Sequence, residues 1–110
     1  MAVLEKIRTQ GKFTVESGDT SDAIEFFDDI SIVLVTVSFP EGTGTAKIQT
    51  SNSLHDDLVA GTGVWVDWPN GSITETTQDW CYAPNALRIV NESTESDETV
   101  LVEIRGNYSK

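Results

Sequence analysis

Residues 30–39 read ISIVLVTVSF and form the longest apolar run in the chain. In an extended strand, alternate side chains point to opposite faces. On one face of this run Val33, Val35, Val37 and Phe39 are all apolar. Ile32 and Leu34 make the other face apolar too, which is typical of a central strand covered on both sides. The second apolar face could be covered either by a loop of the same chain or by a neighbouring subunit.

Shorter runs with the same β-branched character follow one another along the chain, separated by Gly, Pro, Asn and Asp. We expect strands at residues 11–15, 22–27, 30–39, 45–50, 63–68, 72–77, 85–91 and 98–105. Alternation places these side chains in the core: Phe13, Val15, Ala46, Ile48, Leu87, Ile89, Val100, Val102 and Ile104. No amphipathic helix is evident. The pattern predicts an all-β, single-domain antiparallel β-sandwich of about eight strands.

A turn signal falls between two of the expected strands. Pro69-Asn70-Gly71 separates residues 64–68 from residues 72–77, and such a sequence favours a tight reversal. We therefore expect these two runs to form an antiparallel hairpin.

The length and charge of the chain exclude several classes of protein. At 110 residues the chain suits one domain, and seven Lys and Arg against eighteen Asp and Glu give a net charge of -11. This charge disfavours nucleic acids and anionic membrane surfaces as partners. One Cys excludes an internal disulfide, and the N-terminal residues do not resemble a signal peptide, so we expect synthesis in a cytoplasm.

The first residues differ in charge from the rest. Residues 1–12 carry Lys6, Arg8 and Lys12 against Glu5, a net +2, which leaves -13 for residues 13–110. We divide the chain into an N-terminal arm or edge segment, residues 1–10, and a β-sandwich domain, residues 11–110.

No group of residues predicts catalysis or a metal site. His55 stands beside Asp56 and Asp57, but no second His or spaced nucleophile accompanies it, so we interpret this stretch as a dispensable solvated loop. Cys81 has no basic neighbour and is expected to be a small buried side chain. We predict no enzyme activity, cofactor or metal.

A cluster of carboxylates is a candidate calcium site. It consists of Asp19, Asp22, Glu25, Asp28 and Asp29, and its spacing does not match an EF-hand loop. We interpret it as acidic surface.

Aromatic residues in the second half are candidates for an interface. Trp65, Trp80 and Tyr82 could contact a partner, stack on a sugar or fill the core. Trp65 and Trp68 differ by three positions, so a regular strand would point them to opposite faces. At the other end of the chain, the mixed apolar and basic residues of the first segment are also candidate interface residues: Val3, Leu4, Lys6, Ile7 and Arg8.

Several stretches of the chain, taken together, resemble small all-β accessory proteins of tailed-phage virions, the head-decoration or cement proteins. They are GKFTVESGDTSDAIEF (11–26), TGTAKIQTSNS (43–53), GTGVWVDWPNG (61–71), NALRIVNESTES (85–96) and TVLVEIRG (99–106). The resemblance implies a jelly-roll-like sandwich, self-association as a homotrimer, and a non-enzymatic role on the outside of a virion. The implied partner is the major capsid protein of a bacteriophage. The N-terminal MAVLEKIR has no counterpart in this pattern.

The sequence therefore predicts a structural protein that decorates and stabilises a phage capsid. The alternative is a tail-fibre or carbohydrate-binding β-sandwich module that uses its surface aromatic residues.

Overall fold

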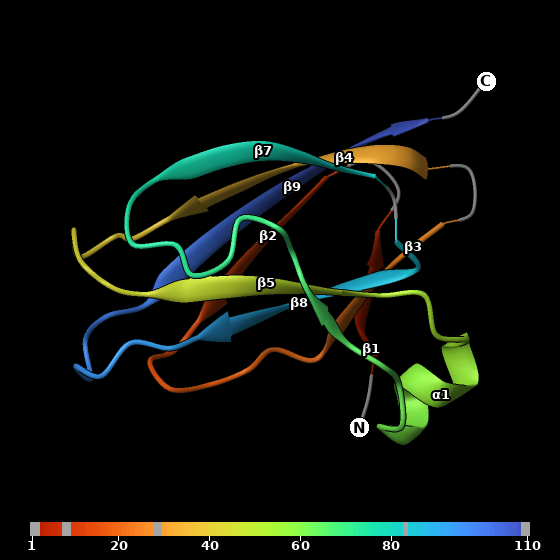
Figure 1. Ribbon diagram of the computed structural model, residues 1–110, viewed down its shortest axis with the longest axis horizontal. Helices are drawn as coiled ribbons and strands as arrows, with labels where there is room; N and C mark the ends of the chain where they lie inside the picture. Colours follow the sequence, from red (N-terminus) through yellow and green to blue (C-terminus); the bar gives the residue numbers. More distant parts are fainter. Residues whose placement is uncertain (1–2, 8–9, 28–29, 83, 109–110) are drawn as a thin grey trace.

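The protein folds as two β-sheets packed face to face, in a computed structural model that describes residues 3–7, 10–27, 30–82 and 84–108 (Figure 1). The strands of the five-stranded sheet, in spatial order, are β1 (Val3–Ile7), β3 (Ala23–Phe26), β8 (Ala86–Asn91), β5 (Ala46–Ser51) and β6 (Val66–Asp67). Those of the four-stranded sheet are β2 (Gln10–Val15), β9 (Val100–Tyr108), β4 (Ile30–Ser38) and β7 (Thr77–Tyr82). The predicted all-β sandwich is confirmed.

Strands β2 to β9 have the connectivity of a jelly roll. Strand β2 pairs with β9, β3 with β8, β4 with β7, and β5 with β6, each pair antiparallel. This is the pairing of one long hairpin, and the β4–β9 and β5–β8 pairs roll that hairpin into two layers. Strand β1 lies outside this pattern, because it joins the edge of the five-stranded sheet parallel to β3.

The core lies between the sheets and follows the predicted alternation. Every side chain assigned to it from the sequence is buried, including the three from β9, Val100, Val102 and Ile104. On β4 the inward face is fully buried, whereas Ile32 and Leu34 on the outward face are only half-buried. These two side chains lie beside the neighbouring strand β7.

The expected hairpin around Pro69-Asn70-Gly71 was wrong. A tight turn is present, since the amide of Gly71 donates to the carbonyl of Trp68 at 2.9 Å. The chain nevertheless continues along β5, because Trp68 donates to Ile48 and Ile73 exchanges two backbone hydrogen bonds with Ala46. The turn is thus a bulge in an edge segment, and it lets both Trp68 and Ile73 reach the core.

Three further segments differ from the prediction. Of the expected strand at 63–68 only Val66–Asp67 is a strand, and residues 72–77 contribute only the bridge at Ile73 and the first residue of β7. Residues predicted to be loop form the six-residue helix α1 (His55–Ala60), which buries Leu58 and ends at Gly61 with a positive φ of 80°. It lies at one end of the sandwich (Figure 1). In the described part of the chain no helix has the length and apolar character needed to cross a bilayer.

Candidate binding surface

The exposed apolar side chains gather in one part of the sequence. Among the residues whose side chains the structure describes, every exposed large hydrophobic side chain comes from residues 54–82: Leu54, Val59, Val64, Val66, Trp80 and Tyr82. Apolar side chains left in water on a folded domain mark surfaces that contact partners when they occur together. These residues therefore define the candidate binding surface.

Strand β7 presents the two largest of these side chains. Because Cys81 points into the core, its neighbours Trp80 and Tyr82 point outward, where they are 50% and 87% exposed. Trp80 lies opposite Leu34 and Tyr82 opposite Ile32 on β4. Aromatic and aliphatic side chains that lie opposite each other on two strands contribute to the stability of a sheet. We call these four residues the aromatic face.

On the free edge of β7, one backbone amide is hydrogen-bonded to a side chain of the same strand. The Asp79 carboxylate accepts a hydrogen bond from the Trp80 amide at 2.8 Å and another from Asn70 Nδ2 at 3.2 Å. An edge amide that already has an acceptor is less able to recruit a further strand. A partner would therefore contact this side of the protein through side chains.

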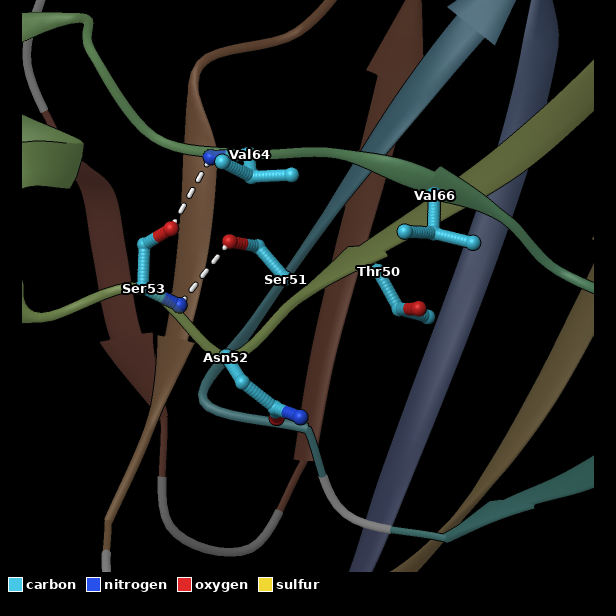
Figure 2. Close-up of a pocket in the computed structure, with 6 residues that line it drawn as sticks. All are labelled: Thr50, Ser51, Asn52, Ser53, Val64 and Val66. Carbon is cyan, nitrogen blue, oxygen red and sulfur yellow. Dashed lines mark hydrogen bonds between the residues drawn. The ribbon is translucent and has the colours of Figure 1, made fainter.

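A hollow of about 450 Å³ opens beside the segment that leads into β6 (Figure 2). Val64 and Val66 line it on one side, and residues 50–53 line it on the other. The Ser53 hydroxyl accepts the Val64 amide at 2.9 Å, and the Ser51 hydroxyl accepts the Ser53 amide at 3.1 Å. The bond between Val64 and Ser53 joins the two segments, and the bond between Ser53 and Ser51 orders the turn within residues 50–53.

A second hollow of about 340 Å³ adjoins the first at Thr50 and reaches the aromatic face. Its lining includes the buried ring of Trp68 together with Asp79, Trp80 and Tyr82. The two hollows and the aromatic face thus lie along the same side of the sandwich, where β5, β6 and β7 meet.

Trp65 does not belong to this surface. Its ring packs against the small cluster of Ala23, Leu58 and Ala86, and the Arg88 guanidinium lies 4.5 Å from its centroid. Trp65 therefore lies with the five-stranded sheet, whereas Trp80 and Tyr82 belong to the four-stranded sheet. The three aromatic residues predicted as one set form two separate groups.

The predicted interface residues of the N-terminal segment are placed only in part. The structure gives the backbone of Val3, Leu4, Lys6 and Ile7 as β1, paired with β3, and their side chains lie outside what it describes. Arg8 lies outside the described residues.

His55 is not a side chain of a solvated loop, as the sequence had suggested. Its Nδ1 lies 2.7 Å from Oε1 of Glu25, and since a carboxylate accepts, the ring donates this bond. The Glu25 side chain is only 5% exposed, whereas that of His55 is 58% exposed. Glu25 was expected on an acidic surface. It is buried because β3 is covered on both faces.

The remaining candidates for chemistry lie apart from one another. Burial raises the pKa of the Cys81 thiol, and the charge of Asp79 raises it further, which opposes a thiolate nucleophile. Within the described residues no three His, Cys, Asp or Glu side chains gather as metal ligands. Asp28 and Asp29 of the proposed carboxylate cluster lie outside those residues.

Comparison with known proteins identifies no family. No family model and no curated protein matches the chain. Among solved structures, the chain is similar to the pre-peptidase C-terminal domain of a collagenase from Bacillus anthracis, with 12% identity and a TM-score of 0.43. The similarity covers 97% of this chain and 98% of that one.

Proposed function

We propose that this protein is a non-enzymatic structural protein that binds the outside of a phage capsid and stabilises the shell by bridging neighbouring capsid subunits. The observation that supports it best is the aromatic face, an exposed apolar surface on a sheet. The capsid as partner follows from the resemblance to decoration proteins, as does the location on the virion exterior.

The charge of the protein favours contact through this face. Interfaces exclude charged residues from their centres, because desolvating unpaired carboxylates is costly. With eighteen acidic residues in the chain, a partner gains most from the part of the surface that carries apolar side chains. Each copy needs only a modest contact, since the many copies on a shell add their binding energies.

Self-association is part of the proposal. Ile32 and Leu34 remain half-buried after β7 has packed beside them, so a second copy could complete their cover. The trimer comes from the resemblance. We expect sedimentation equilibrium at micromolar concentrations to give a mass above the monomer's 12.0 kDa. A strict monomer in solution and on the capsid would contradict this.

Removing the two exposed rings should weaken binding. We expect Trp80→Ser with Tyr82→Ser to lower capsid affinity by at least about tenfold, because buried aromatic side chains dominate interfaces. The measurement is cosedimentation with undecorated heads. Leu101→Ser is the control, since Leu101 is half-buried on β9, away from β7. Equal loss in both variants would point to misfolding, and unchanged binding of the double variant would contradict the proposed face.

Deleting residues 1–8 tests the N-terminal segment. We expect the β-rich circular dichroism to persist, because β2 to β9 complete the jelly roll without β1. We also expect weaker capsid binding, since this segment carries a net positive charge next to an acidic body. If the shortened protein binds as well as the full chain, the segment is not an attachment site.

Glycan binding is the second candidate. Trp80 and Tyr82 point to the same side of β7, beside a hollow that also contains the polar side chains of Asn70 and Asp79. Rings next to hydrogen-bonding groups suit a sugar. Binding on a glycan array, lost in the double variant and without capsid affinity, would favour this alternative.

A further inference from the structure

Arg88 is held in one orientation on the outer face of the five-stranded sheet. One face of its guanidinium lies over the Trp65 ring, and its Nε–H donates to Gln49 Oε1 at 2.7 Å. Gln49 in turn donates from Nε2 to Asp67 Oδ1 at 2.9 Å, and this bond lowers the pKa of the Asp67 carboxyl. Because Gln49 Nε2 donates to Asp67, Gln49 Oε1 is the atom that faces Arg88. The guanidinium is therefore held in position before a ligand binds.

Among the residues that the structure describes, the guanidinium has no carboxylate partner, although the protein is strongly acidic. Among the described residues, the ion pairs join Lys47 to Asp67 and Glu92 and His55 to Glu25, and none involves Arg88. Its only hydrogen bond within that part of the chain is the one from Nε. The Nη groups are therefore left to bind an acceptor from outside. Partial burial lowers the pKa of Arg88, yet a guanidinium remains charged at neutral pH.

Arg88 lines a hollow of about 320 Å³ that is separate from the side carrying the aromatic face. The half-buried Trp65 supplies apolar surface there, and Gly61 and Gly63 contribute no side chains to fill it. The hollow also contains Asp22, which does not form an ion pair with Arg88. It thus combines a fixed donor fork, a carboxylate acceptor and apolar contacts.

We propose that this hollow binds a carboxylate that carries an N–H donor beside it, as found at the C-terminus of a peptide chain. The Nη groups present the planar fork that matches a carboxylate in a two-point contact. Asp22 provides an acceptor for the adjacent amide, and the exposed part of the Trp65 ring accommodates an aliphatic side chain. A multiply charged phosphate is disfavoured by the net charge of -11.

Nuclear magnetic resonance titration of the full chain tests this site. The probes are acetyl-Ala-Ala-Leu with a free C-terminal carboxylate, the same peptide as its C-terminal amide, and sodium acetate. We expect saturable shifts at the Arg88 Nε–H and the Trp65 indole N–H with the free acid, no saturable shift with the amide, and weaker saturable binding of acetate. Arg88→Gln should weaken binding at least about tenfold, the usual size of a lost charge-assisted contact.

Three further variants separate recognition from folding. Arg88→Lys keeps the charge but loses the fork, so it should also bind more weakly. Asp22→Ala should weaken the peptide but not acetate. Arg105→Gln is the matched control, because Arg105 is an exposed arginine on the other sheet, and it should bind as the wild type does.

The titrations can contradict the proposal or restrict the class of ligand. Equal binding of acid and amide, or no saturable shift, would overturn the proposal. Acetate binding as tightly as the peptide would keep a carboxylate site but reject a chain terminus as its ligand. These results do not depend on the capsid proposal, because the aromatic face takes no part in them.

Discussion

Replacing Asn91 with Asp should destabilise the protein by about 3 kcal/mol, because it places a carboxylate oxygen against two carbonyl oxygens in the core. Asn91 is 1% exposed at the end of β8. Its Nδ2 donates to the carbonyl of Val15 at 3.0 Å and to that of Glu98 at 2.8 Å. Its Oδ1 accepts the amide of Ser93 at 2.9 Å. One side chain therefore links the ends of β2 and β8 and the turn before β9.

Urea unfolding monitored by tryptophan fluorescence measures the effect, since Trp68 is buried. The matched control is Asn52→Asp, the same change at an exposed loop position, which should alter the free energy of unfolding by less than about 0.5 kcal/mol. If both variants unfold at the same urea concentration, the Asn91 bonds do not hold the two sheets together.

The alternation of apolar and polar residues predicted the core well. Most strands of the sandwich pack one face against the core and expose the other face to solvent. Val100, Val102 and Ile104 are buried and Glu103 is exposed, as period-two spacing requires. Strand β7 was placed wrongly because its pattern is inverted. Its aromatic residues Trp80 and Tyr82 face solvent, and a cysteine is its one buried residue.

Helix α1 was not predicted because its six residues are too few to show a helical pattern of apolar side chains. One buried residue, Leu58, anchors it, and a glycine follows it at the position where a left-handed conformation ends a helix. The carboxylates of Asp56 and Asp57 in its first turn are favourable there, but they equally suit a loop.

The residues of the candidate sites could be predicted only where the residue type by itself indicated an interface. Trp80 and Tyr82 stood out by type. Val64 and Val66 did not, because a strand-like run with valines is typical of a core, and only the edge position of β6 leaves them exposed. Arg88 and Asp22 are far apart in the sequence, and the fold alone brings them to one hollow.

The contact between His55 and Glu25 gives a structural reason to expect that His55 is not dispensable, contrary to the prediction from the sequence. We expect His55→Ala to lower the free energy of unfolding by about 1–2 kcal/mol, because the buried Glu25 carboxylate loses its donor. The effect stays below that of a fully buried pair, since the ring of His55 is more than half exposed and water can replace part of the bond.

Three comparisons by urea unfolding isolate this contact from the rest of α1. Asp56→Ser with Asp57→Ser should change the stability by less than about 0.5 kcal/mol, because both side chains are exposed. His55→Gln retains a donor and should recover part of the loss. In a Glu25→Gln background, His55→Ala should cost less than in the wild type, because the charge that it leaves unpaired is gone. A His55→Ala effect as small as that of the Asp pair would show that Glu25 finds its stabilisation elsewhere, and that the first turn of α1 is the solvated segment that its composition suggests.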